Sequence, residues 1–212
     1  IPVGTTPVAL ALPPDESKVY VVNFRSDKVS VITTATLEVS KDIAVGIGPA
    51  AIVITPNGQR AYVANSGATP NGTVSVMNLA TDTLLETLPA YRPSPSVVTL
   101  SPDGRVLYVL GAGSRFVGVI DTTTNQVARV ETDDDPVAVT FSPTGQRAYI
   151  ANQGDNTVVV LDTTTFPPTK LTEVEVGQGP NSLVVSPDGA KVYVANPLDN
   201  TISIISAAAT QA

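Results

Sequence analysis

Apolar and polar residues alternate in short runs along the whole chain, with the period of two that is typical of half-buried β-strands. The clearest runs are Val74–Met77 and Ile202–Ile205, which are rich in β-branched residues. No segment of 10 residues shows a convincing helical period. The pattern therefore predicts an all-β protein.

Three phrases recur five times in the same order, so an internal repeat is the main feature of the sequence. The first is a turn phrase such as Ser101-Pro-Asp-Gly104, the second a strand such as Tyr62–Asn65, and the third an alternating run such as Val74–Met77. The tyrosines that mark the second phrase lie 41 to 46 residues apart. They are Tyr20, Tyr62, Tyr108, Tyr149 and Tyr193.

Each repeat is predicted to form four short strands. In the second repeat these are Ala50–Ile54, Ala61–Ala64, Thr73–Asn78 and Leu84–Leu88. Repeats of roughly 40–45 residues with four strands each are typical of β-propellers, in which sheets pack face to face around an axis. The alternative is an open solenoid, which needs polar capping repeats that neither terminus resembles.

We expect a five-bladed β-propeller with four antiparallel strands per blade, forming a single domain over residues 1–212. The last repeat lacks a fourth strand, whereas the chain begins with Ile1–Val3 and Gly4, the phrase that follows fourth strands elsewhere. We therefore predict that Ile1–Val3 forms the outer strand of the last blade and closes the ring, which removes open sheet edges. Further repeats in a longer parent would instead make these five part of a larger ring. The predicted repeat units are 4–46, 47–89, 90–132, 133–177, and 178–206 together with 1–3.

The Tyr-Val-x-Asn strands, the Val-Ser-Val-Ile runs and the Ser-Pro-Asp-Gly turns resemble the YVTN β-propeller repeat family over residues 1 to about 206. The resemblance implies a propeller fold. It does not imply one function, because that family includes surface-layer and adhesion-like proteins as well as quinoprotein-associated propellers. Its propellers usually have seven blades, so five repeats are a departure.

Composition excludes several kinds of chemistry. The chain has no Cys and no His, which rules out thiol catalysis, disulfides, Ser-His-Asp triads and imidazole-bound metals. We predict no catalytic residues and no cofactor, and we lean towards a protein that is not an enzyme. The net charge of −7 and the scattered basic residues argue against nucleic-acid binding.

Location and assembly are inferred from composition alone. No apolar stretch reaches the roughly 18–20 residues of a membrane helix, so no membrane span is predicted. Few lysines, many threonines and an acidic balance favour an extracellular, cell-surface or periplasmic protein. We expect a monomer.

Candidate binding residues lie where the repeats differ from one another, because positions shared by all repeats are explained by packing. The differences fall in loops before the first strand, or between the second and third strands, of the third and fourth repeats. Loops on a rigid framework are where binding residues concentrate. The candidates are Tyr91, Arg92, Arg115, Phe116, Asp133, Asp134 and Asp135.

The run Asp133–Asp135 has two interpretations. Clustered carboxylates suit Ca²⁺, yet three adjacent aspartates lack the alternating spacing of a calcium loop. Alternatively, the run is a solvated acidic loop whose charges are relieved by Arg92, Arg115 or Arg129. No metal site is predicted, and calcium at this run is the one ion considered.

Two functions remain after these exclusions. The first is a non-catalytic binding or surface-display propeller that recognises a protein, glycan or surface polymer through loops on one face. The alternative is an enzyme or enzyme subunit of the lyase, lactonase or quinoprotein-dehydrogenase-associated propeller type. Lyase-type sites typically rely on His, which this chain lacks. We therefore favour the first.

Overall fold

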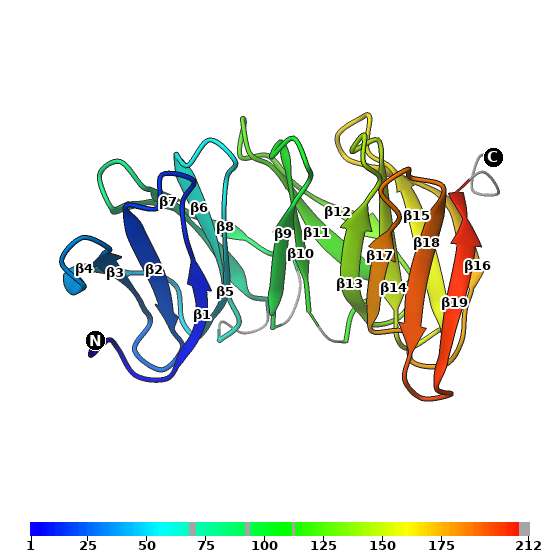
Figure 1. The fold of residues 1–212 in the computed structure, drawn as a ribbon, viewed down its shortest axis with the longest axis horizontal. Coiled ribbons are helices and arrows are strands. Elements are labelled where there is room, and N and C mark those ends of the chain that lie inside the picture. The colour runs from blue at the N-terminus through cyan, green and yellow to red at the C-terminus, as the bar shows by residue number, and fades with distance from the viewer. Residues whose placement is uncertain (68–70, 92–93, 112, 208–212) are drawn as a thin grey trace. The chain divides into compact units, whose positions relative to one another are not determined.

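The structure is a computed structural model that describes residues 1–67, 71–91, 94–111 and 113–207. Within this part of the chain, nineteen strands form five antiparallel sheets (Figure 1). The strand orders are β1-β2-β3-β4, β5-β6-β7-β8, β12-β11-β10-β9, β13-β14-β15-β16 and β17-β18-β19. The prediction of an all-β chain built from four-stranded antiparallel sheets is confirmed, and these sheets are consistent with a propeller.

The strands follow the sequence repeat closely. The first sheet contains β1 (Pro7–Ala11), β2 (Lys18–Asn23), β3 (Lys28–Thr33) and β4 (Glu38–Ala44). The second contains β5 (Pro49–Ile54), β6 (Arg60–Asn65), β7 (Thr73–Asn78) and β8 (Thr83–Pro89). The third contains β9 (Val97–Leu100), β10 (Val106–Leu110), β11 (Phe116–Asp121) and β12 (Val127–Glu131). The fourth contains β13 (Pro136–Phe141), β14 (Arg147–Asn152), β15 (Thr157–Asp162) and β16 (Thr169–Glu175). The fifth contains β17 (Ser182–Val185), β18 (Lys191–Asn196) and β19 (Thr201–Ser206).

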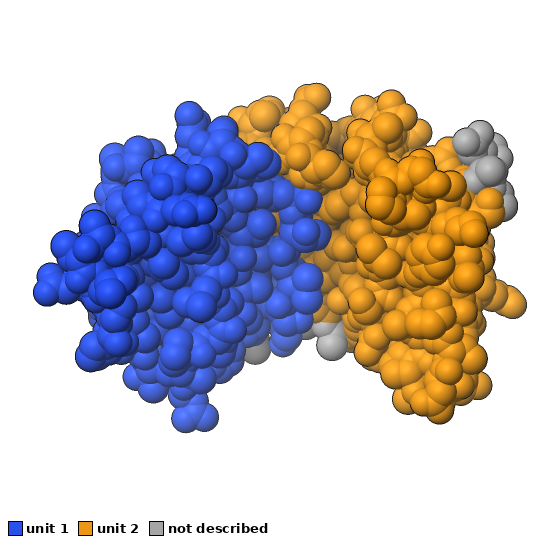
Figure 2. All heavy atoms as spheres, in the orientation of Figure 1, with its two compact units in different colours: residues 1–100 blue, residues 101–212 orange. Residues whose placement is uncertain are grey.

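The chain divides into two compact units, residues 1–100 and residues 101–212, which Figure 2 shows in different colours. The first unit holds the first and second sheets together with β9. The second holds β10 to β12 and the fourth and fifth sheets.

In the first unit, two sheets pack through unlike faces. The repeated tyrosine and its neighbours form one face, which we call the tyrosine face; in the first sheet it carries Tyr20, Val22, Val29 and Val31. The opposite face of each sheet we call the receiving face; in the second sheet it carries Ala61, Val63 and Met77. These two sets form one buried cluster, because alternate residues of a strand point to opposite faces.

The same pairing occurs in the second unit. The tyrosine face of the fourth sheet, with Tyr149, Val158 and Val160, packs on Val192 and Val194 of the receiving face of the fifth sheet. In the third sheet, Tyr108 meets the ring of Phe141 edge-on, with ring centroids 5.2 Å apart. The repeat therefore stacks sheets in one direction, with tyrosine face to receiving face.

The predicted fourth strand of the last blade is not formed by the N-terminus in this structure. Residues 1–3 lie in no strand, and the fifth sheet has three strands. Ile1 and Val3 instead line a hollow over the first sheet together with Val8 and Leu10 of β1. Apolar residues directly ahead of β1 have this apolar surface within reach, which favours the local contact. Closure of a ring is not shown.

Candidate functional site

The candidate loops are held by a hydrogen bond that recurs between repeats. The segment before the first strand of a sheet donates a backbone N–H to an acidic or amide side chain in a loop between second and third strands. In the fifth sheet, Gln178 N donates to Asp199 Oδ2 at 2.9 Å. In the fourth sheet, Asp134 N donates to Asp155 Oδ2 at 2.8 Å. The two loops of a sheet are thereby fixed at one edge.

A glycine in this segment normally covers a buried asparagine at the end of the second strand. A Cβ added to Gly46 would lie 2.6 Å from Asn65 Nδ2, and one added to Gly177 would lie 2.5 Å from Asn196 Nδ2. A serine of the third strand completes the cluster, since Ser203 Oγ accepts hydrogen bonds from Gly177 N and from Asn196 Nδ2. The glycine is required here because the approach leaves no room for a side chain.

The fourth sheet departs from this arrangement at every member except the asparagine. Asp133 occupies the glycine position and Val159 the serine position, as the strand register shows. Asp133 Oδ2 accepts a 2.5 Å hydrogen bond from the Thr157 hydroxyl, and Oδ1 lies 3.1 Å from Lys170 Nζ. The Asn152 amide donates to Thr157 Oγ1 and to the Ile150 carbonyl, and the Thr157 hydroxyl in turn donates to Asp133.

The environment of Asp133 favours its ionised form. Burial raises the pKa of Asp133, but the hydrogen bond from Thr157 and the Lys170 ammonium outweigh burial, so the pKa lies below its ordinary value. Lys170 also pairs with Glu173 at 2.6 Å. Burial lowers the pKa of Lys170, and its contacts with Glu173 and Asp133 outweigh that effect and raise it.

The other two aspartates of the run have different partners. Asp135 stands at the position of Gly179 and shares its left-handed backbone, with φ of 57° against 67°. Its Oδ1 accepts a 3.0 Å hydrogen bond from Gly113 N. Asp134 uses its backbone N–H to bind Asp155, and its side chain is half-buried. The carboxylates of Asp133 and Asp135 are thus engaged separately, whereas Asp134 contributes its backbone N–H.

Arg115 and Phe116 lie in the second unit with the aspartate run. Arg115 Nη2 is 3.2 Å from Asp155 Oδ2, and the Arg115 side chain is 70% exposed. The Arg129 guanidinium lies 5.4 Å from the centroid of the Phe116 ring, a cation–π arrangement. In the aspartate run, the Asp133 carboxylate is therefore paired with Lys170. Arg129 stacks on the Phe116 ring instead.

The remaining candidates belong elsewhere. Tyr91 lies in the first unit, is exposed, and has a left-handed backbone with φ of 53°. Arg92 lies outside the described residues. The structure therefore brings Arg115, Asp133, Asp134 and Asp135 into one set of loops and does not test the first-unit part of the prediction.

No group of three or more acidic side chains that could hold a metal ion occurs in the part of the chain that the structure describes. The engaged carboxylates of Asp133 and Asp135 explain why adjacency in sequence does not produce a shared cation sphere here, since Ca²⁺ takes 6–8 oxygen ligands. Calcium, the one ion considered from the sequence, gains no structural support at this loop.

Sequence reasoning missed Asp155, Thr157 and Lys170, which hold the loops together. One signal was available, because aligning Thr132–Pro136 with Val176–Pro180 places Asp133 on a glycine position. A carboxylate in place of a glycine predicts a new polar partner nearby. That Lys170 is the partner of Asp133 could not be predicted in this way, because a long side chain on a fourth strand can reach several acceptors.

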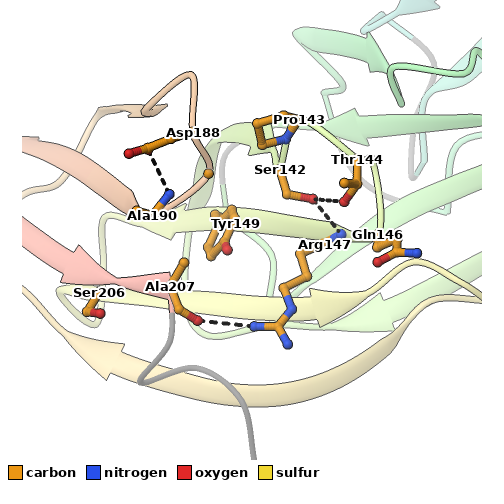
Figure 3. A pocket seen from close by; sticks show the side chains of 11 residues that line it. Ser142, Pro143, Thr144, Gln146, Arg147, Tyr149, Asp188, Ala190, Ser206 and Ala207 are labelled. Carbon is orange, nitrogen blue, oxygen red and sulfur yellow. Dashed lines mark hydrogen bonds between the residues drawn. The ribbon is translucent and has the colours of Figure 1, made fainter.

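A hollow of about 480 Å³ lies in the second unit between the turns of the fourth and fifth sheets (Figure 3). The polar groups drawn there bond mainly within the turns: Ser142 accepts a hydrogen bond from Arg147 N, and Asp188 accepts one from Ala190 N. Ala207 is the repeat equivalent of Leu79, which fills this position in the second sheet. The structure does not describe the residues after Ala207. Because the polar groups of the hollow bond mainly within the turns, the hollow gives no reason to expect a ligand.

Residues 1–170 match the family described as the Choice-of-anchor I domain. The chain belongs to this family. The match covers most of the sequence, and the family's description suggests a cell-surface or secreted protein. The comparisons support a β-propeller family for the choice-of-anchor I chain, but they do not single out the YVTN repeat family.

A curated relative of this choice-of-anchor I chain is the "Seven-bladed beta-propeller protein Rv1057" of Mycobacterium tuberculosis (strain ATCC 25618 / H37Rv). The two are 37% identical over 134 residues, which make up 61% of this chain and 34% of the relative. The chain therefore spans about a third of the length of the curated relative it matches.

Two solved structures resemble the choice-of-anchor I chain in fold. A functionally unknown protein from Desulfotomaculum acetoxidans DSM 771 has a TM-score of 0.75 at 24% identity, with 97% of this chain and 71% of that chain covered. Kuenenia stuttgartiensis hydrazine synthase has a TM-score of 0.50 at 24% identity, with 95% and 84% covered. At this identity, both likenesses concern the fold alone. Among the described residues, no helix is long and apolar enough to cross a membrane.

Proposed function

We propose that this chain is a non-catalytic binding or surface-display propeller, which recognises a protein, glycan or surface polymer through the loops of the third and fourth sheets. The observation that carries the proposal is the Arg115–Asp155 pair next to the aspartate run. Asp155 holds the backbone of Asp134 and leaves the Arg115 guanidinium largely exposed. A charged group is thus displayed on a fixed loop.

The chemistry of these loops suits recognition. Arg115 and Asp134 supply opposite charges, and the nearby Phe116–Arg129 stack supplies an aromatic surface. Arginine and aromatic residues are enriched where partners bind. Tyr91 and Arg92 extend the proposal as candidates from the first unit. We propose a cell-surface or secreted location outside the cytoplasm and no cofactor.

The enzyme alternative has no specific support in the site. The likeness to hydrazine synthase is at the level of the fold, and folds of this class host many functions. The number of blades stays a proposal as well. Five sheets fit the predicted five-bladed ring, whereas the seven-bladed relative and the unpaired N-terminal residues favour a larger one.

A loop graft tests the binding proposal. Thr132→Val, Asp133→Gly, Asp134→Gln and Asp135→Gly together convert the fourth-sheet loop to the sequence of residues 176–179. The graft keeps the repeat's own backbone and removes all three carboxylates. The matched control changes Thr5→Gln and Thr6→Gly, which gives the first-sheet loop the same sequence in its last three residues.

Wild type, graft and control are then compared on a glycan array and on purified cell-wall polymers. We expect wild type and control to bind the same ligand, and the graft and Arg115→Ala to lose at least about tenfold in affinity, as for a binding hot spot. Equal binding by the graft, or no binding by wild type to any polymer or glycan, would contradict the proposal in its glycan and polymer form.

A further inference from the structure

The fifth sheet exposes a face that every comparable sheet within the two units buries. Ile202 and Ile204 of β19 occupy the same register positions as Val158 and Val160 of β15. The two valines are fully buried against the fifth sheet, whereas Ile202 is 63% and Ile204 is 60% exposed. Figure 1 shows β19 (red) as the last strand of its sheet. The tyrosine face of the fifth sheet is therefore apolar and exposed.

The first sheet exposes the opposite kind of face. Leu10 of β1 stands at the register position of Ile52, which packs against the tyrosine face of the neighbouring sheet. Leu10 is 68% exposed and lines the hollow of about 520 Å³ beside Ile1 and Val3. Exposed contiguous apolar patches of this kind mark interaction surfaces.

The contact made by the first sheet's tyrosine face shows what such a face binds. Tyr20 donates a 2.7 Å hydrogen bond to Asp82 Oδ1, and Lys18 Nζ lies 2.6 Å from Asp82 Oδ2. Asp82 lies in the turn before β8, on the sheet that presents the receiving face. Where a tyrosine face carries both the lysine and the tyrosine, as in the first sheet, its partner supplies apolar side chains and one carboxylate.

The fifth sheet carries a lysine and a tyrosine at the positions that bind Asp82 in the first sheet, beside an apolar face. Lys191 and Tyr193 of β18 stand where Lys18 and Tyr20 stand in β2, within the matching sequences Lys-Val-Tyr-Val. Tyr193 is only half-buried, in contrast to the full burial of Tyr20.

We infer that the tyrosine face of the fifth sheet is a docking surface for a further sheet of the same repeat, which lies outside these 212 residues and carries an acidic residue at the Asp82 position. A seven-bladed relative, of which this chain covers 34%, gives such a sheet a place in the longer protein. The first sheet is poorly matched to the role, because Leu37 occupies its Asp82 position with the same left-handed backbone. That mismatch argues against docking by a second copy through its first sheet.

An extended chain tests the inference. Residues 1–206 are joined to a copy of residues 34–89, so that Ser206 takes the place of Thr33 and the natural junction between the first and second sheets is reproduced. The added segment supplies a fourth strand and a complete second sheet with its own Asp82. The matched variant carries Leu in place of that added aspartate, as the first sheet does.

The readouts are hydrophobic-dye fluorescence, sedimentation velocity and thermal unfolding. We expect the 212-residue chain to bind dye, and Ile202→Thr with Ile204→Thr to reduce the dye signal at least about twofold without lowering the melting temperature. Val158→Thr with Val160→Thr, at the same register positions, should lower the melting temperature by about 5 °C or more, because it alters the core. In the extended chain, Ile202→Thr with Ile204→Thr should no longer change the dye signal, which then comes from the tyrosine face of the added sheet, and should instead lower the melting temperature by about 5 °C or more. The variant with leucine should melt lower than the extended chain with aspartate.

Two results would overturn the inference. If the 212-residue chain binds no dye and the isoleucine variant loses as much stability as the valine variant, the face is already covered within this chain. If the chain self-associates in sedimentation and the extension leaves that association unchanged, a second copy is the occupant.

Discussion

The hydroxyl of Tyr20 donates a hydrogen bond of 2.7 Å to Oδ1 of Asp82, and this contact links the first sheet to the second. Both groups are largely withdrawn from solvent, and burial, the hydrogen bond and the nearby charge of Asp82 raise the pKa of Tyr20 well above its ordinary value. Tyr108 stands at the same repeat position and is buried alike, but it is not paired alike. Tyr108 has a buried hydroxyl for which no partner is found among the described residues.

We therefore expect Tyr20→Phe and Tyr108→Phe to differ. Tyr20→Phe removes a hydrogen bond to a charged acceptor and should lower the free energy of unfolding by about 1.5–3 kcal/mol. Tyr108→Phe removes an unpaired buried hydroxyl and should be neutral or stabilising. Urea unfolding followed by circular dichroism measures both, and equal losses in the two variants would contradict the assignment.

The Asp133–Thr157 pair should make part of the stability depend on acid. The pKa of Asp133 is lowered in the folded chain, so its contribution is present above the ordinary value of 3.8 and is lost as the pH falls through the folded pKa. Thr157→Val should lower the free energy of unfolding by about 1 kcal/mol at neutral pH. The part of this loss that comes from Asp133 should disappear as the pH falls through the folded pKa of Asp133, whereas the part that comes from the Asn152 hydrogen bond should remain.

The matched control for that measurement is Thr73→Val. Thr73 occupies the same register position in β7, and its hydroxyl accepts a hydrogen bond from the neutral side chain of Asn65. Its effect should not change with pH in the acid range. A pH-independent loss in Thr157→Val as well would show that Asp133 is not the partner that matters.

The fourth sheet combines Asp133 at the glycine position with Val159 at the serine position. We expect that this combination can be transferred to the fifth sheet only when both residues are changed together. Gly177→Asp alone places side-chain atoms against Asn196 and should cost about 1–3 kcal/mol. Ser203→Val alone removes an acceptor used by Gly177 N and Asn196 Nδ2 and should cost about 1–2 kcal/mol.

The double variant reproduces the Asp133 and Val159 combination, and it should cost at least about 1 kcal/mol less than the sum of the single changes. Thr201 stands where Thr157 stands, and its hydroxyl becomes the new hydrogen-bond donor when it exchanges its present acceptor, Asp199, for the introduced aspartate. A double-mutant cycle with strictly additive effects would show that the two exchanges are unrelated.

Calcium addition should leave thermal unfolding unchanged. The carboxylates of Asp133 and Asp135 are bound to Thr157, Lys170 and Gly113, so too few oxygens remain free for a cation that needs 6–8. Melting curves with millimolar Ca²⁺ and with chelator should coincide. A reversible rise of several degrees with Ca²⁺ would revive the metal interpretation by linkage.

The strands of each sheet could be predicted from the sequence because they obey local rules. The alternation of apolar and polar residues determines which side chains of β6 and β7 face each neighbouring sheet. Phrases such as Thr55-Pro-Asn-Gly58 define the turns. Such signals lie within a few residues of the atoms that they position. The same locality explains why Asp135 could be expected in a loop before β13.

The partners of the candidate residues could not be predicted in the same way. Lys170 is 37 positions from Asp133, and Asp155 is 40 positions from Arg115. Which of several flexible charged side chains meets a given carboxylate depends on the register of β16 and on the loop geometry. Ile1–Val3 form no strand in the structure for a similar reason, because their sequence matches the end of a fourth strand but an apolar surface lies nearer in the chain.

The directional stacking of tyrosine face on receiving face has a consequence for how such a chain can change over generations. A sheet inserted in the series by gene duplication presents the same two faces to its new neighbours, so only single positions, such as the one that holds Asp82 in one sheet and Leu37 in another, have to change with the number of sheets. The divergent loops sit at one edge of the sheets, where Asp135 and Gly113 link the fourth sheet to the third outside the apolar stacking faces. Under the proposed function, the loop sequences and the number of sheets can therefore vary separately, because the loops lie apart from the stacked faces.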